Sequence, residues 1–353
     1  MELELSHSDK KGENESMKTL VATRLVCRSL EKRFTRRNRV GDGLDPACVQ
    51  SWICNVLNRG VVDLDLFITF LGKFPPVLTL NLMNKTLVKL SIGSLFIVKL
   101  SHDVFLPLLK KLCLYSIDFD GDRNVVETLL SRCPVLQEFE FSEMKSEKHL
   151  PVQIQWSSPS LKRLRIRFQY VRDISFDFPN LAFFEISYED GSKFLKVKLD
   201  SLIEARLNHL SDGGEIWGPV YGNAHVNMIH LINAISNVRV LHLSSVFHEG
   251  LKHHISKSTC GDVCVCYGSK ENRSSCLSTS RVKVLEISGY GGDRKDLNQV
   301  KHFLAKLPCL ELVRISAAND FTAPIDICDL LTLDTLPRAS PKCKIEHKRI
   351  VFV

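Results

Sequence analysis

The sequence predicts an α/β solenoid, in which short parallel strands form one curved sheet with helices on its convex side. Three observations predict this fold. A six-residue apolar frame recurs ten times along the chain, seven of the nine steps between frames are 20 to 28 residues long, and amphipathic segments fill several steps. Steps of about 20–29 residues are typical of leucine-rich repeats, so the predicted fold is an irregular leucine-rich-repeat solenoid.

The frame has the form apolar-x-x-apolar-x-apolar. Its last two apolar positions alternate with exposed ones, as a half-buried strand requires. One unit cannot bury its own apolar face, so the units must stack. The ten frames are Val61/Leu64/Leu66, Leu87/Leu90/Ile92, Leu109/Leu112/Leu114, Leu136/Phe139/Phe141, Leu161/Leu164/Ile166, Leu181/Phe184/Ile186, Leu202/Ala205/Leu207, Val238/Leu241/Leu243, Val282/Leu285/Ile287 and Leu310/Val313/Ile315.

Three segments between the frames predict helices on the convex side. Asp45-Pro46 opens the first, which continues through VQSWICNVLNRG to a C-cap at Gly60. The segments DRNVVETLLSRCP and LNQVKHFLAKLPC show apolar i, i+3, i+4 spacing, and a proline ends each helix. The alternative, unrelated strands in a sandwich or an α/β sheet, does not account for ten frames in register.

The pattern divides the chain into four segments. Residues 1–44 are a polar and basic lead-in that we expect to be poorly ordered, and residues 45–243 are the solenoid. Residues 244–281 are an irregular loop containing cysteines, and residues 282–353 are a related C-terminal unit expected to run strand–helix–strand–helix–strand. The basic residues of the lead-in suit a nuclear-localisation or phosphate-contacting arm, but we favour a solvated segment.

Composition excludes several classes of protein. The 353 residues carry 47 Lys and Arg against 40 Asp and Glu, and this net charge of +7 is too dilute to indicate a nucleic-acid partner. No apolar run approaches the roughly 20 residues that span a bilayer, and the charged N-terminus lacks the apolar core of a signal peptide. Most of the 12 cysteines stand singly in apolar stretches, as reduced thiols do. We therefore expect a cytoplasmic and/or nuclear protein without a membrane partner.

Sequence motifs for catalysis or cofactor binding are absent: there is no phosphate loop, no nucleophile elbow and no His-Glu-x-x-His pair. We expect neither enzymatic activity nor a cofactor. One cluster has metal-ligand chemistry, formed by Cys260, Cys264, Cys266 and Cys276. Its spacing lacks the two short-spaced pairs of structural zinc sites, so a flexible thiol-bearing loop is favoured over a zinc site.

The residues between the buried frame positions should point to the concave surface, where their identity is free to serve a partner. Charge alternates there in blocks, which suits a protein partner with matching charge; the alternative is that these charges only keep an exposed sheet soluble. Phe183 is expected to be an apolar anchor beside three arginines, which leave the same face of one strand. The candidate partner-binding residues are Lys89, Lys111, Tyr115, Glu138, Glu140, Arg163, Arg165, Arg167, Phe183, Glu185 and Arg206, with Asp63, Asp65, Glu204 and His242 on the same face.

Several short motifs resemble one known family when taken in their order along the chain. They are the run from Asp45-Pro46 through VQSWICNVLNRGVVDLDL, then KTLVKL at 85–90, LSRCPVL at 130–136, VKVLEI at 282–287, VKHFL at 300–304 and LPRASPKCKI at 336–345. Together they resemble plant F-box/LRR-repeat proteins with a C-terminal FBD domain. The resemblance implies a non-enzymatic substrate adaptor of a cullin-RING ubiquitin ligase, whose repeats hold the protein to be ubiquitylated and whose F-box docks on the ligase's linker subunit.

The N-terminal part departs from that family. An F-box opens with a Leu-Pro pair and carries an Arg-Trp near its end, but no proline precedes Pro46 and no tryptophan precedes Trp52. We therefore expect the F-box to be missing or truncated, and the linker subunit to be a partner only if an F-box is present. Two alternatives stay open: a small-ligand receptor with a basic pocket around Arg163, Arg165 and Arg167, and a truncated paralogue without ligase function.

Overall fold

The computed structural model describes fifteen stretches of the chain: residues 21–28, 33–37, 46–70, 77–100, 103–119, 124–143, 152–168, 171–188, 193–209, 231, 234–244, 280–291, 294–317, 333 and 335–348. The helices with defined bounds are α1 (Pro46–Asn58), α2 (Val125–Arg132) and α5 (Arg294–Lys306).

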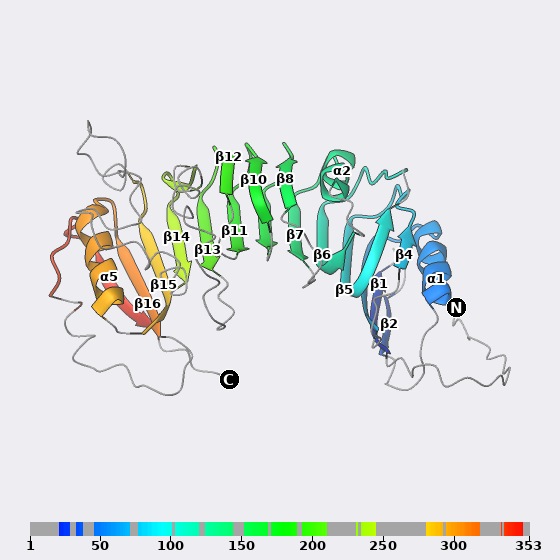
Figure 1. Ribbon diagram of the computed structural model, residues 1–353, viewed down its shortest axis with the longest axis horizontal. Helices are drawn as coiled ribbons and strands as arrows, with labels where there is room; N and C mark the ends of the chain where they lie inside the picture. Colours follow the sequence, from blue (N-terminus) through cyan, green and yellow to red (C-terminus); the bar gives the residue numbers. More distant parts are fainter. Residues whose placement is uncertain are drawn as a thin grey trace.

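A fourteen-stranded sheet runs through the molecule from end to end (Figure 1). Its strands are β1 (Val21–Arg28), β2 (Arg33–Arg37), β3 (Asp63–Phe70), β4 (Val77–Leu80), β5 (Lys89–Leu100), β6 (Lys111–Asp118), β7 (Glu138–Glu143), β9 (Arg163–Arg167), β11 (Phe183–Tyr188), β13 (Glu204–His209), β14 (Val240–Ser244), β15 (Val284–Tyr290), β16 (Leu312–Ala317) and β17 (Lys344–Lys348). Their order in the sheet is β17-β16-β15-β14-β13-β11-β9-β7-β6-β5-β3-β1-β2, and β4 pairs with β5.

Every pairing from β3 to β17 is parallel, which confirms the predicted solenoid sheet. A repeated backbone contact fixes its register. The N–H groups of Lys110 and Lys111 both donate to the carbonyl of Val88, at 2.8 and 3.2 Å, and Gln137 and Glu138 donate in the same way to Lys110. Because each turn contacts the turn before it, every unit enters the sheet in the same register as its neighbour.

The ten apolar frames form the core beneath this sheet. All of their positions are buried except Leu241, which is partly buried against the same cluster. The predicted helices are also present: α1 begins at Pro46, α2 lies within its amphipathic segment, and α5 begins three residues before the segment LNQVKHFLAKLPC and ends inside it. Gly60 follows α1 with a φ of 72°, a left-handed conformation that glycine adopts without a Cβ clash.

The convex side differs from the prediction in the middle of the solenoid. There the steps between frames hold strands instead of helices: β8 (Val152–Ser157), β10 (Val171–Asp177) and β12 (Lys193–Lys198) form a separate parallel sheet in the order β12-β10-β8. Two of these steps are only 20 and 21 residues long, whereas the steps that contain α2 and α5 have 27 and 28. A strand rises about 3.3 Å per residue against 1.5 Å for a helix, so six residues suffice to cross the convex side.

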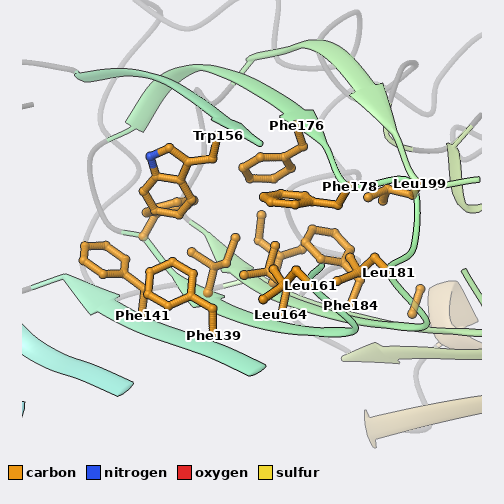
Figure 2. Packing of buried hydrophobic residues seen from close by; sticks show 14 of the residues in the cluster. Phe139, Phe141, Trp156, Leu161, Leu164, Phe176, Phe178, Leu181, Phe184 and Leu199 are labelled. Carbon is orange, nitrogen blue, oxygen red and sulfur yellow. The ribbon is translucent and has the colours of Figure 1, made fainter. Parts of the chain in front are cut away.

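Aromatic residues fill the space between the two sheets, as Figure 2 shows. Trp156 of β8 packs edge-on against Phe139 and Phe141 of β7, with ring centroids 5.8 and 5.5 Å apart. One repeat further on, Phe176 of β10 meets Phe184 of β11 at 5.9 Å. Edge-to-face pairs at these separations contribute roughly 0.5–1.5 kcal/mol beyond the burial of their area, so this part of the core is aromatic and rigid.

Two segments of the lead-in form strands. Residues 21–28 and 33–37, expected to be poorly ordered, form an antiparallel hairpin of β1 and β2, and β1 pairs antiparallel with all eight residues of β3. The physical reason is that β3 would otherwise present a row of unpaired backbone groups at that end of the sheet.

At the other end, β15, α5 and β16 give the predicted strand–helix–strand order, and β15 pairs in register with β14, so the C-terminal unit continues the same sheet. β17 is the last strand of that unit. Of the predicted second helix there, the structure describes only Leu333, which is helical. The loop at 245–279 lies outside the described residues.

Candidate functional site

The concave face of the main sheet consists of three rows of side chains, one row for each alternate position along the strands. Each row crosses the sheet, because neighbouring strands pair residue by residue. The first row is Lys89, Lys111, Glu138, Arg163, Phe183 and Glu204; the middle row is Ser91, Cys113, Glu140, Arg165, Glu185, Arg206, His242, Glu286, Arg314 and Glu346; the third row is Gly93, Tyr115, Ser142, Arg167, Ser187 and Asn208. All eleven candidate partner-binding residues lie in these rows, and Asp63 and Asp65 of β3 extend the first two rows beside Lys89 and Ser91.

Glu140 is the centre of a charged cluster on this face. Its carboxylate accepts hydrogen bonds from Lys111 at 3.2 Å, from Arg165 at 2.9 Å and from the Tyr115 hydroxyl. Lys111 also contacts Glu138 at 3.0 Å, and Arg165 reaches Glu185 on the next strand at 3.2 Å. The cluster joins β6, β7, β9 and β11, so it fixes the side chains of four successive repeats relative to one another.

The pKa values in this cluster follow from its geometry. Burial alone would raise the pKa of the Glu140 carboxyl, but the hydrogen bonds from Tyr115 and Lys111 and the charge of Arg165 outweigh it and lower that pKa. Burial opposes the charge of Lys111, yet its hydrogen bonds to Glu138 and Glu140 raise its pKa overall. Burial and the bond to Glu140 raise the pKa of the Tyr115 hydroxyl. Glu140 and Lys111 are therefore charged at neutral pH, and Tyr115 is protonated and acts as a donor.

Phe183 does not have the role expected of it. Its ring is only 4% exposed, because three guanidinium groups cover it on the concave side. The Cζ atoms of Arg163, Arg165 and Arg206 lie 4.3, 5.1 and 5.3 Å from the ring centroid. Cations at these distances are attracted by the ring's negative face, so Phe183 positions arginines and is not an accessible apolar anchor.

A second charged cluster is formed by Glu204 of the first row together with His242, Glu286, Arg314 and Glu346 of the middle row. His242 contacts Glu204 at 3.2 Å and Glu286 at 2.8 Å through its two ring nitrogens. Arg314 contacts Glu286 at 2.8 Å and Glu346 at 3.1 Å. Burial lowers the pKa of His242 against the raising effect of the two carboxylates. The sequence prediction did not include Glu286, Arg314 and Glu346, although the first two occupy the same frame positions as the residues it named.

At the opposite end of the face, Lys89 contacts Asp63 at 3.6 Å. Most of the predicted charges therefore have partners within the face itself. A row of alternating charge that is paired across strands is rigid and nearly neutral, and it presents a fixed pattern of polar groups to the solvent.

A basic ligand pocket around Arg163, Arg165 and Arg167 receives no support from the described geometry. A cavity of about 490 Å³ lies instead at the turns that lead into β7, β9 and β11, and its lining residues are Pro134, Val135, Gln137, Pro159, Ser160, Lys162, Asn180 and Ala182. None of the three arginines lines this cavity, and Arg163 and Arg167 are exposed on the open sheet.

The predicted cysteine cluster of Cys260, Cys264, Cys266 and Cys276 lies outside the described residues. Within the part of the chain that the structure does describe, no group of three or more His, Cys, Asp or Glu side chains could hold a metal ion.

Comparison with known proteins places this chain in a family. Residues 49–199 match the family model described as "FBD-associated F-box protein At5g56370, LRR repeats". F-box/LRR-repeat protein At2g42730 of Arabidopsis thaliana is 44% identical over 374 residues, which cover 90% of this chain and 80% of that protein. The chain belongs to the F-box/LRR-repeat family.

Two further F-box/LRR-repeat relatives support this assignment. F-box/LRR-repeat protein At2g42720 of Arabidopsis thaliana is 45% identical over 84% of this chain and 77% of its own length. The putative F-box/FBD/LRR-repeat protein At3g59240 of the same plant is 33% identical over 83% of this chain and 67% of its own length. Among solved structures, a Bacteroides fragilis protein aligns with 92% of this chain at a TM-score of 0.36 and 11% identity, a similarity too low to bear on function.

F-box/LRR-repeat membership confirms the resemblance predicted from the motifs and indicates a protein-interaction scaffold; no catalytic family is among these matches. The matched family model ends at residue 199, so the FBD assignment of residues 282–353 stays a prediction. Among the described residues, no helix is long and apolar enough to cross a membrane.

Proposed function

We propose that this F-box/LRR-repeat chain is a non-enzymatic scaffold that binds a protein on its concave face, as the substrate-recognition part of a cullin-RING ubiquitin ligase adaptor. The observation that carries the proposal is the concave face itself: a continuous parallel sheet whose polar side chains are held in place by contacts across strands. Side chains that are already ordered lose little conformational entropy when a partner binds.

The face also has the composition of a binding surface. Arginine and tyrosine, which dominate interface energetics, lie among acidic residues on the same strands, and such charge patterns set partner choice and association rate. The apolar groups of the frames are buried in the core, so specificity on this face rests on polar and charged contacts.

A site-specific photo-crosslinker tests where the partner binds. Placed at Ser187, on the third row of the concave face, it should capture a discrete protein from plant extract. The matched control places the same group at Gln155, an exposed position of β8 on the convex sheet. Equal capture of the same protein at both positions would contradict the proposed face.

Co-purification with the ligase's linker subunit tests the adaptor part separately. A stable complex supports the adaptor role. Failure to bind the linker, with the solenoid shown to be folded, would refute that role and favour a paralogue without ligase function. The proposal also places the chain in the cytoplasm, the nucleus or both, and a fluorescent fusion imaged in plant cells would contradict it by labelling another compartment.

A further inference from the structure

Strand β9 carries two arginines whose charge is not neutralised by the face around them. Arg163, Arg165 and Arg167 all point to the concave side, but only Arg165 contacts carboxylates, those of Glu140 and Glu185. Among the described residues, no carboxylate lies within ion-pair distance of Arg163 or Arg167, and both are exposed. The two outer guanidinium groups are therefore available to a partner.

The acidic residues beside β9 are already engaged. Glu138, the neighbour of Arg163 in the first row, contacts Lys111 at 3.0 Å. Glu140 is shared between Lys111 and Arg165, and Glu185 contacts Arg165. A carboxylate can serve two cations, as Glu140 does, but these three carboxylates face four cations, Lys111, Arg163, Arg165 and Arg167, so positive charge would persist at this place.

Arg163 is also held in an orientation that suits recognition. Its guanidinium lies over the Phe183 ring, with Cζ 4.3 Å from the centroid. An arginine in such a cation–π contact keeps N–H groups that can bind a carboxylate in bidentate fashion. Because this contact already orders the side chain, a partner would meet a preformed donor.

Arg167 lies in a row without charged neighbours. In the third row it is flanked by Ser142 and Ser187, and the next residues on either side are Tyr115 and Asn208. Ser142, Ser187 and Asn208 offer neutral hydrogen-bond donors and no competing carboxylate, whereas the Tyr115 hydroxyl already donates to Glu140. An anionic group that reaches Arg167 would therefore find further donors beside it.

We propose that the partner of this face presents two carboxylates about 13 Å apart, one to Arg163 and one to Arg167. The two arginines are four residues apart on β9, and at about 3.3 Å per residue their Cα atoms are separated by about 13 Å. Acidic side chains four residues apart in an extended protein segment match that spacing. This inference rests on the proposed function, because it assigns the chemistry of the protein that the concave face binds.

Two short labelled peptides of equal composition test the spacing. In Glu-Thr-Val-Thr-Glu, an extended backbone places the acidic residues about 13 Å apart on one face, whereas Thr-Val-Thr-Glu-Glu carries the same charge on adjacent residues. Fluorescence anisotropy titrations of the full chain at low salt should show tighter binding of the first peptide. Arg163→Gln and Arg167→Gln should each weaken that binding about tenfold and abolish the preference.

Two further variants separate recognition from overall charge. Arg163→Lys keeps the charge but loses the planar fork, so it should behave like Arg163→Gln. Arg239→Gln removes an exposed arginine at the turn before β14 and should leave binding unchanged. Equal affinity for the two peptides, or an equal loss in Arg239→Gln, would overturn the inference. A single-stranded oligonucleotide that binds more tightly than the peptide, and whose binding Arg163→Gln abolishes, would overturn it too.

Failure of this inference is distinguishable from failure of the proposed function. If the crosslinker at Ser187 captures a protein with undiminished yield in the Arg163→Gln and Arg167→Gln backgrounds, the concave face binds a protein but the two arginines do not select it. If the chain prefers the spaced peptide as expected but does not bind the linker subunit, the inference about Arg163 and Arg167 stands and the ligase role is refuted.

Discussion

Replacing Asn84 by alanine should destabilise the first repeats by about 3 kcal/mol. Asn84 is a buried polar residue that joins the end of α1 to the turn before β5. Its side-chain amide donates to the carbonyl of Leu57 at 2.7 Å, and its side-chain oxygen accepts from the backbone N–H groups of Thr86 at 2.8 Å and Leu87 at 2.7 Å. The variant Asn84→Ala loses all three.

The magnitude follows from counting these groups. A typical intramolecular hydrogen bond contributes about 1 kcal/mol net, and a backbone group left buried and unpaired costs at least as much. Three lost bonds therefore give about 3 kcal/mol, a large share of the 5–15 kcal/mol that stabilises an ordinary domain. Since a solenoid unfolds by units, the loss should fall on α1, β3 and β5.

Urea denaturation and amide hydrogen exchange together measure this effect. Exchange should accelerate in α1 and β5 and stay unchanged in β15 and β16. Asn180→Ala is the matched control, because Asn180 is exposed and makes one bond of 2.8 Å to the Pro159 carbonyl; it should cost no more than about 0.5–1 kcal/mol. A loss below about 1 kcal/mol in Asn84→Ala would refute the reasoning.

Three other predictions concern the core and the concave face. Trp156→Ala should cost about 3–5 kcal/mol in urea denaturation, because the cavity lies among packed rings, while exposed Leu195→Ala should cost little. The pKa of Glu140 in the folded protein lies below its ordinary value of 4.5, so its contribution to stability is complete above about pH 4.5 and is lost as the pH falls through the lower folded pKa. The difference in unfolding free energy between wild type and Glu140→Gln should therefore shrink on acidification. A difference that stays constant with pH would contradict the assignment. Phe183→Ala should weaken binding of the spaced acidic peptide as Arg163→Lys does, since the arginine loses its support, and unchanged binding would show that the stacking is not needed.

The sequence determined the repeat because its signal is periodic and local. Leu109, Leu112 and Leu114 reveal a buried strand face by spacing alone, and Pro46 and Gly60 mark the two ends of α1. The strands β8, β10 and β12 were missed, although VQIQWS alternates as a strand does, because the prediction named helices in three other segments and no convex element between β7 and β13. The hairpin of β1 and β2 depends on pairing with β3, which no local pattern in the lead-in shows.

The sequence shows which residues lie on the concave face, but it does not show which of them contact one another. Alternation along each strand places Arg165 and Phe183 on that face. Which residues meet depends on register between repeats: His242 contacts Glu286, 44 positions later in the chain. The burial of Phe183 likewise follows from arginines on two neighbouring strands, β9 and β13, which sequence spacing does not bring together.

The alternating middle row also constrains how the repeat array can change in length. Glu140, Arg165, Glu185 and Arg206 belong to four successive repeats, so each cation lies between two anions or beside one. Deleting the single repeat that carries Arg165 would place Glu140 against Glu185, two like charges on adjacent strands, and would remove the cation that contacts both of them. Removing two consecutive repeats would preserve the alternation. Viable deletions and duplications in this part of the array should therefore be those that change the number of repeats by two.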